Sequence, residues 1–425
     1  MNTPDIRFKG FTDAWEQRKL IEFLEVSCEK NTEDFFTKKD VLSVSGDFGI
    51  VNQIEFQGRS FAGASVSNYG VVLNGDVVYT KSPLNTNPYG IIKTNKGKPG
   101  IVSTLYAVYH PRENVDSVFV QTYFEQHARM NNYMQPLVNK GAKNDMKVSS
   151  ENALKGFVIF PGIEEQRRIV ELFSYLDNLI TLHQRKLDTL KNYKKAMLIK
   201  MFPREGQKVP EIRFNGFTGD WEKREFEDAF DILQNNTFSR ADLCLDGGAA
   251  INIHYGDVLI HYGDCTDVSV ITAQYIASRQ VAEKYKKSWL RNGDIVLADT
   301  AEDEAAGKCT EIMGMGDIPV IAGLHTMPLR AKTDFAEGFL GYYMNSGSYH
   351  SQLVPFMHGT KVLSLSKKDL SNTHILFPHS HEEQLKIGEL FKSIDTLIVE
   401  QERRTNRLHN LKQAMLNKMF VKGGN

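Results

Sequence analysis

The sequence predicts an α+β protein in which two globular mixed α/β domains are joined by two long helices packed as an antiparallel coiled coil. Three observations predict this fold and its internal pseudo-twofold repeat. Residues 4–18 return as residues 210–224 with ten of fifteen positions identical. Residues 164–202 return as residues 382–420 with twenty of thirty-nine positions identical. The segments between the matched blocks look largely unrelated, so one repeated frame carries two different inserts.

Each larger repeat predicts one long helix. Pro161 precedes the first helix and Pro203 closes it, whereas Pro378 precedes the second. Ser380 and Glu383 have the spacing of a capping box at the start of the second helix. About 38 residues at 1.5 Å each give a rod of roughly 57 Å. Because an apolar stripe of that length needs an equally long partner, we expect the two helices to cover each other.

The apolar stripe has coiled-coil spacing but drifts toward a period of 3.6, so we expect only slight supercoiling. The d-type positions include Tyr193 in the first helix and Leu397 and Leu411 in the second. Both helices place a polar residue at the middle a-type position, His183 and Gln401. Antiparallel pairing would bring these two residues into one central layer that fixes the register. The alternative is that His183 is only a semi-exposed residue of the seam.

The repeat divides the chain into four segments. We expect a globular domain over 1–155, a long helix with a linker over 156–209, a second domain over 210–376 and a second long helix over 377–425. Both domains contain short strand-like runs separated by glycine turns. These runs are Gly70–Tyr79, Ile101–His110, Leu290–Ala298 and Ile318–Leu329. Antiparallel helices would then hold the two domains a defined distance apart.

Composition limits the classes of function. With 51 basic and 52 acidic residues the formal net charge is −1, so no global field attracts the chain to nucleic acid or to a membrane. Basic residues can still be segregated onto one face. Four scattered cysteines lack metal-ligand spacing and are typical of a reducing compartment. No stretch reaches eighteen apolar residues, so we expect a soluble cytoplasmic protein without a metal or other cofactor.

Polar and basic residues gather in loops of both predicted domains. Lysine, arginine and asparagine are the residue types that contact phosphates and base edges. In the first domain the candidates are Lys81, Ser82, Asn85, Asn87, Tyr89, Lys93, Lys96, Lys98, Lys143 and Asn144. In the second they are Arg279, Lys284, Lys287, Thr360 and Lys361. The alternative for each single residue is a solvated loop charge.

Catalytic motifs fail on inspection. The run Asn87-Pro88-Tyr89 is similar to the Asn-Pro-Pro-Tyr motif of amino-methyltransferases, but it lacks one proline and has no glycine-rich cofactor loop. Lys96-Gly97-Lys98-Pro99 has no glycine at the spacing of a phosphate-binding loop, and Gly314-Met315-Gly316 lacks the third glycine of a dinucleotide fingerprint. By elimination the sequence indicates a binding and organising protein with no catalytic residues.

The tandem arrangement, the opening P-x-I-R-F-x-G-F-T-x-x-W-E and the helix with EEQ, LF, D, AM and KMF together resemble one family. The chain resembles, over essentially its whole length, the DNA specificity subunits of type I restriction-modification systems. The resemblance implies two target recognition domains, each reading one half of a bipartite double-stranded DNA site. It also implies that the paired helices set the spacing and dock two methyltransferase subunits, which restriction subunits join. No base-contacting residue is carried over.

Two other classes of function stay open. One is a DNA methyltransferase that uses Asn87-Pro88-Tyr89, and binding of S-adenosylmethionine by the isolated protein would support it. The other is a scaffold or antirestriction decoy that binds the methyltransferase but no DNA. A decoy that mimics DNA should be strongly acidic, and this chain is not.

Surface residues of the two helices also match between the copies. Arg185 pairs with Arg403 and Lys194 with Lys412, which a seam between two helices does not require. We expect these four residues to bind the methyltransferase subunits, one patch for each of two partners. The alternative is that recent duplication left the positions alike.

Overall fold

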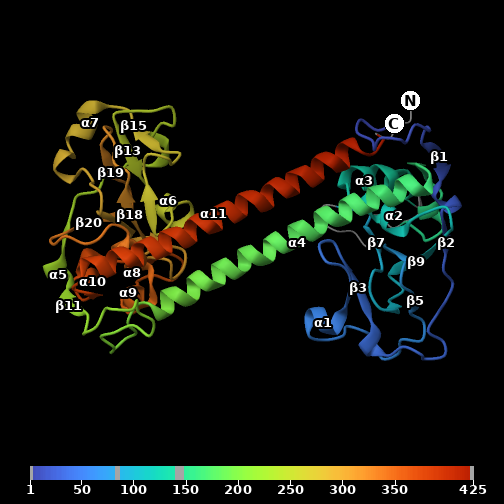
Figure 1. The fold of residues 1–425 in the computed structure, drawn as a ribbon, viewed down its shortest axis with the longest axis horizontal. Coiled ribbons are helices and arrows are strands. Elements are labelled where there is room, and N and C mark those ends of the chain that lie inside the picture. Colours follow the sequence, from blue (N-terminus) through green and yellow to red (C-terminus); the bar gives the residue numbers. More distant parts are fainter. Residues whose placement is uncertain (1–2, 82–86, 139–147, 422–425) are drawn as a thin grey trace. The chain divides into compact units, whose positions relative to one another are not determined.

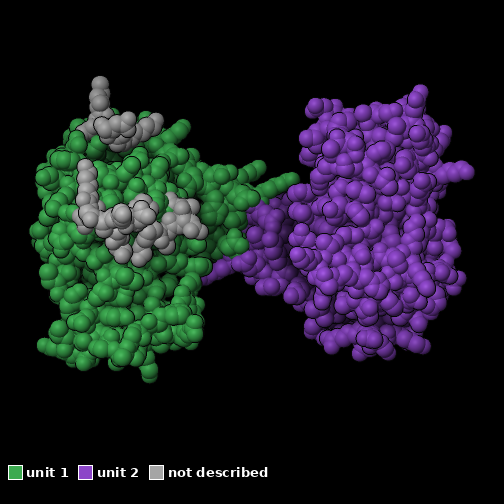
Figure 2. Space-filling view, turned by 180° about the vertical axis from the view of Figure 1, so that it is seen from behind, with its two compact units in different colours: residues 1–184, 403–425 green, residues 185–402 purple. Residues whose placement is uncertain are grey.

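The computed structural model describes residues 3–81, 87–138 and 148–421. It confirms the mixed α and β fold with two long helices, α4 (Ile163–Lys200) and α11 (His381–Lys418) (Figure 1). The chain forms two compact units (Figure 2). Unit 1 contains residues 1–184 and 403–425, and unit 2 contains residues 185–402. Each unit therefore takes one half of each long helix.

Unit 1 is built on a four-stranded sheet whose pairings are all antiparallel. In sheet order the strands are β2 (Leu24–Val26), β9 (Tyr106–Pro111), β6 (Val77–Thr80) and β7 (Ile92–Thr94). Three further pairs are β1 (Glu16–Lys19) with β10 (Phe157–Phe160), β3 (Leu42–Ser45) with β4 (Gly49–Asn52), and β5 (Gly70–Val72) with β8 (Gly100–Val102). The short helices are α1 (Gln53–Gln57), α2 (Ser117–Phe124) and α3 (His127–Met134).

The main sheet of unit 2 has the same four-stranded antiparallel order as that of unit 1, and a fifth strand joins it in parallel. In sheet order its strands are β12 (Phe230–Ile232), β20 (Thr326–Ala331), β16 (Ile295–Ala298), β18 (Cys309–Met313) and β14 (Cys265–Asp267). A second sheet contains β15 (Gln274–Ile276), β13 (Ala250–Ile253) and β19 (Val320–Ala322). Two further sheets have two strands each: β17 (Thr300–Ala301) pairs with β21 (Leu363–Ser364), and β11 (Glu222–Glu225) pairs with β22 (His374–Phe377). The short helices are α5 (Phe226–Ala229), α6 (Tyr255–Ile260), α7 (Arg279–Glu283), α8 (Phe339–Asn345), α9 (Gly347–His350) and α10 (Lys367–Leu370).

One buried ion pair of the frame is formed twice. The Arg7 guanidinium donates to both carboxylate oxygens of Glu165, each at 2.7 Å, and Arg213 donates to those of Glu383 at 2.6 and 2.8 Å. The same arginines also donate to the backbone carbonyls of Asp13 and Gly219. The arginine of the opening motif thus clamps the second glutamate of the EEQ motif, which explains why both motifs recur. Because Arg213 occupies the Glu383 carboxylate, Ser380 supplies the helix cap alone, accepting from the Glu383 N–H at 3.3 Å.

A tryptophan of one copy meets a phenylalanine of the other in each unit. Trp15 packs edge-on against Phe420, and Trp221 packs edge-on against Phe202, each with ring centroids 6.2 Å apart. Beside these contacts the Ile6 N–H donates to the Lys418 carbonyl at 2.9 Å, and the equivalent bond in unit 2 also measures 2.9 Å. In each unit the opening motif of one copy therefore packs against the helix end of the other copy.

The two long helices run antiparallel within each unit. In unit 1 Asp177 contacts Lys412, and in unit 2 Lys191 contacts Glu402 while Phe202 stacks on Phe391. Direct pairing of the helices is thus confirmed inside both units. The central layer predicted for the middle of the seam stays a prediction.

The seam itself corrects part of the predicted stripe. Tyr193, Leu397 and Leu411 were predicted at d-type positions but are 47%, 50% and 42% exposed. One series of buried and half-buried positions alternates steps of four and three residues, and in α11 other buried or half-buried positions, such as Leu390 and Leu416, lie beside it. In α11 the series is Ile387, Phe391, Ile394, Ile398, Gln401, Thr405, Leu408, Lys412 and Met415. This series has an average spacing of 3.5, the period of a regular coiled coil, and the drift toward 3.6 stays a prediction.

Candidate functional site

A buried lysine joins three elements of unit 1. Lys412 on α11 places its Nζ 2.7 Å from Asp177 Oδ1 on α4 and 2.8 Å from Glu125 Oε2, just after α2. The Lys412 and Glu125 side chains are only 16% and 15% exposed. Burial acts to lower the pKa of Lys412, but the two carboxylates outweigh it and raise that pKa above its ordinary value. The network is therefore charged, and it ties the sheet domain of unit 1 to both helices.

The equivalent lysine of the other copy forms the same kind of network in unit 2. Lys194 on α4 places its Nζ 2.5 Å from Asp395 Oδ1 on α11 and 2.7 Å from Asp264 Oδ2, just before β14. The Tyr342 hydroxyl donates to the other Asp395 oxygen at 2.9 Å. Burial again acts to lower the lysine pKa, and the two aspartates raise it overall. Each long helix thus supplies one lysine and one aspartate to these networks.

These contacts correct the premise of the predicted partner surface. Lys194 and Lys412 were placed on exposed faces, but both ammonium groups are largely buried and bind carboxylates of the same unit. A lysine stem is long enough to cross a helix seam, so the match between copies has an internal cause. Arg185 and Arg403 are exposed on their helices. Partner binding stays a prediction, and exposure supports it only for the two arginines.

Three of the predicted polar residues line one cavity in unit 1. Asn87, Lys93 and Lys96 surround a space of about 890 Å³, which His127 and Lys412 also line. Burial lowers the pKa of Lys93. The structure therefore brings part of the predicted set together beside the Lys412 network.

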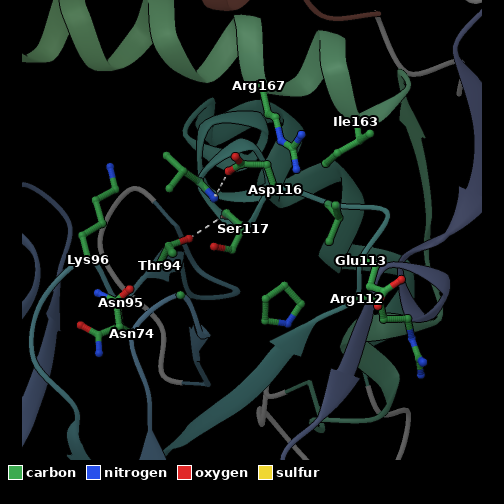
Figure 3. A pocket seen from close by; sticks show the side chains of 14 residues that line it. Asn74, Thr94, Asn95, Lys96, Arg112, Glu113, Asp116, Ser117, Ile163 and Arg167 are labelled. Atoms are coloured by element: carbon green, nitrogen blue, oxygen red, sulfur yellow. Dashed lines mark hydrogen bonds between the residues drawn. The ribbon is translucent and has the colours of Figure 1, made fainter.

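A second cavity of unit 1 is lined by two cations, Arg112 and Arg167, that were not predicted from the sequence. Lys96, Arg112 and Arg167 lie around a space of about 460 Å³ together with the amides of Asn74 and Asn95 (Figure 3). Glu113 and Asp116 line the same space, and Arg112 and Arg167 form ion pairs with Glu25 and Glu164, so the cavity has a mixed polar lining. Arg167 lies in the repeated helix at a position where the other copy has a leucine. This difference between the two copies could have identified Arg167 as a candidate from the sequence.

The Asn87-Pro88-Tyr89 run forms a tight turn. The Gly90 N–H donates to the Asn87 carbonyl at 2.9 Å, and the Tyr79 hydroxyl donates to the Tyr89 carbonyl at 2.6 Å. Gly90 has a φ of 87°, and a Cβ there would stand 1.9 Å from the Thr80 carbonyl oxygen. Asn87 is buried with its amide oxygen 3.0 Å from His127 Nδ1. These contacts give the run a structural role.

The remaining candidates of unit 1 are dispersed. The Lys81 ammonium lies 3.5 Å from the Thr104 carbonyl, and burial lowers its pKa. Tyr89 is half-buried and Lys98 is exposed. The predicted residues Ser82, Asn85, Lys143 and Asn144 lie outside the described residues.

The candidates of unit 2 occupy two exposed segments. Arg279 on α7 is 86% exposed, and Lys284 and Lys287 follow it within one short stretch of chain. Thr360 and Lys361 are exposed in a turn that begins at Gly359. Arg279, Lys284 and Lys287 thus lie on one surface segment, whereas Thr360 and Lys361 lie on another.

Membrane-spanning helices and clusters of metal ligands are both absent from the described part of the chain. Among residues 3–81, 87–138 and 148–421, no helix is both long and apolar enough to cross a membrane. In the same ranges no three histidine, cysteine, aspartate or glutamate side chains gather as metal ligands would.

Two units on one repeated frame define a paired-domain protein, and known proteins share this organisation. Residues 218–410 match the type I restriction modification DNA specificity domain. The type I restriction enzyme MjaVIII specificity subunit of Methanocaldococcus jannaschii is 26% identical over 61% of this chain, and the match spans 60% of that protein. The putative MjaX specificity subunit of the same organism is 22% identical over 96% of this chain and 93% of its own length.

A solved structure shares the fold. The type I restriction-modification S subunit from M. genitalium superposes with a TM-score of 0.58 at 10% identity, covering 99% of this chain and all of that one. The chain is thus similar to type I restriction-modification specificity subunits, and the match to their DNA specificity domain covers residues 218–410. The resemblance inferred from the repeated motifs is confirmed.

Proposed function

We propose that this chain is the subunit that gives a type I restriction-modification complex its DNA sequence specificity. Each unit reads one half of a bipartite site in double-stranded DNA, and the paired helices set the spacing between the halves. The chain acts by recognition and performs no catalytic step. One observation carries this proposal: the same buried frame and the same four-stranded antiparallel order are built twice from two largely unrelated sequences.

A repeated frame with divergent inserts fits the reading of two different sequences. The Arg7 and Arg213 clamps, the two tryptophan contacts and the four-stranded antiparallel order are equivalent, whereas the sequences on them differ and unit 2 adds the parallel strand β14. Equivalent frames would present both sheets to DNA in the same way, and different loops would then contact different bases. Lys96, Arg112 and Arg167 supply phosphate-binding groups in unit 1, and Arg279, Lys284 and Lys287 supply them in unit 2.

The helices would also dock the other subunits of the complex. Arg185 and Arg403 are equivalent and exposed, so one patch is offered twice. Two copies of a patch recruit two identical partners, which gives two methyltransferase subunits for each copy of this chain. Restriction subunits would join through the assembled complex. The near-neutral charge is compatible with this function if the methyltransferase subunits help to enclose the DNA.

Selection from randomised duplexes tests the proposal. The purified chain, with and without its methyltransferase subunit, should enrich a bipartite motif with a constant gap. Replacing residues 25–150 by the corresponding segment of another specificity subunit should change one half of that motif and leave the other. Enrichment of no motif by either preparation, or a change in both halves after the exchange, would refute the two-reader proposal.

The spacing role has its own test. One heptad added to each helix at its middle keeps the 3.5-residue stripe in phase and adds about 10 Å of helix. The gap between the half-sites should then grow by roughly three base pairs at 3.4 Å each. An unchanged gap in a variant that still selects both half-sites would show that the helices do not set the spacing.

A further inference from the structure

The helix part of the two lysine networks is repeated, and the domain part is not. Lys412 with Asp177 and Lys194 with Asp395 are equivalent pairs of the two helices. The third member is Glu125 in unit 1 and Asp264 in unit 2. Glu125 follows α2, which comes after the sheet strand β9, whereas Asp264 precedes β14.

The two domain carboxylates come from positions that do not correspond. The Gln166 side chain accepts from the Asp116 N–H and the Gln384 side chain accepts from the Ala336 N–H, which aligns the two domains at this point. Nine residues further on, Glu125 therefore aligns with Asn345. The Asn345 amide instead holds the backbone of Cys309, with bonds of 2.9 and 2.8 Å. Two different domains thus place a carboxylate against the same lysine from different parts of their chains.

Burial explains why a carboxylate is needed at this place. The two lysine side chains are only 16% and 18% exposed, so an ammonium with too few partners would be costly there. The opposite helix supplies one carboxylate, and the remaining direction faces the sheet domain. A domain that brings a carboxylate to this point gains a charge-assisted bond, which holds it in one orientation on the helices.

We infer that Lys412 and Lys194 are positioning residues for DNA recognition, each of which fixes its recognition domain on the helix pair through a carboxylate that the domain must supply. The inference rests on the proposed function and adds a rule of compatibility to it. A recognition domain is accepted on this frame when it presents an acidic side chain to the buried lysine. Glu125 is the acidic side chain that meets this requirement in unit 1, and Asp264 meets it in unit 2.

Substitution of the domain carboxylates tests the inference in the full chain with its methyltransferase subunit. Glu125→Gln keeps the shape but removes the charge, and Asp264→Asn is the matched change in unit 2. Each variant should keep both half-site sequences, select a wider range of gap lengths, and bind the original site about tenfold more weakly. Glu171→Gln, which alters an exposed pair with Arg168 on α4, is the control and should change neither property.

A double-substitution cycle separates positioning from general loss of structure. Lys412→Met alone should also weaken binding by about tenfold, and adding Glu125→Gln should cause little further loss, because the two residues act through one contact. Multiplied losses would show that they act independently and would overturn the inference. Amide exchange should keep β6 and β9 protected in every variant, and lost protection there would make Glu125 a folding residue instead.

The same experiment distinguishes the two proposals. A wild-type complex that selects no bipartite motif refutes the proposed function itself. A wild-type complex that selects a motif with a constant gap, while Glu125→Gln keeps that gap and that affinity, refutes the positioning role alone.

Discussion

Removing one phenylalanine near the end of the chain should destabilise the domain formed by the beginning of the chain. Phe420 is 1% exposed and lies in the core of unit 1, with ring centroids 5.7 to 6.2 Å from those of Phe119, Tyr123, Phe173 and Trp15. Replacing a buried phenylalanine by alanine costs about 3–5 kcal/mol. Because four aromatic contacts are lost together, we expect Phe420→Ala to cost about 4 kcal/mol or more.

Hydrogen exchange followed by mass spectrometry measures this effect unit by unit. A loss of about 4 kcal/mol corresponds to roughly a thousandfold faster exchange of the most protected amides. The faster exchange should occur in β6 and β9 of unit 1, and the strands of unit 2 should keep their protection. Phe202→Ala is the matched control, because Phe202 is equally buried and packs against Trp221, Phe339, Tyr343 and Phe391 in unit 2. If Phe420→Ala loosened unit 2, or left β6 and β9 unchanged, the assignment of the helix end to unit 1 would be wrong.

Three further predictions concern single contacts. Arg7→Ala leaves a buried carboxylate without its clamp and should cost unit 1 about 3–5 kcal/mol in urea unfolding, whereas an unchanged midpoint would show that water replaces the guanidinium. Gly90→Ala places a Cβ 1.9 Å from a backbone oxygen and should lower the free energy of unfolding by more than about 2 kcal/mol. Gly75→Ala has open space and should lower it by about 1 kcal/mol. Equal losses of stability in thermal melts would contradict this. Burial raises the pKa of Glu311 from 4.5 to about 7, so the folded state holds the proton more tightly and unit 2 should lose about 3 kcal/mol as the pH rises from 4.5 to 7. Glu311→Gln should remove that loss, and parallel pH profiles of the variant and the wild type would contradict the assignment.

The sequence predicted the frame of the fold better than its sheets, because the repeat is visible without a structure. Both long helices begin and end within two residues of the repeated blocks. The strand-like runs were less well placed, since Gly70–Tyr79 is interrupted by a turn between β5 and β6. Asp76 makes that turn, because its carboxylate accepts from the Leu73 N–H at 2.6 Å and binds His110.

The candidate site shows where reasoning from sequence stops. Lys194 and Lys412 were assigned to the surface because a seam between two helices does not require them, and only the folded chain shows the carboxylates that bind them. Glu125 and Asp264 have no common position in the repeat, so comparing the two copies could not have found them. Arg167 could have been noticed, since the other copy has Leu385 at the equivalent place.

The exchange of helix ends between the units has a consequence for how such a chain could arise. In unit 1 the hydrogen bond from Ile6 to Lys418 joins two ends of the sequence, whereas in unit 2 the equivalent bond from Ile212 to Lys200 spans a short continuous linker. The linker between the copies therefore joins covalently, in unit 2, two segments whose equivalents meet in unit 1 without a covalent link. On the proposed function, a protein of half this length would form both junctions between two identical molecules and would read the same half-site twice. Fusion of two such genes would free each half to diverge, turning a palindromic target into an asymmetric one.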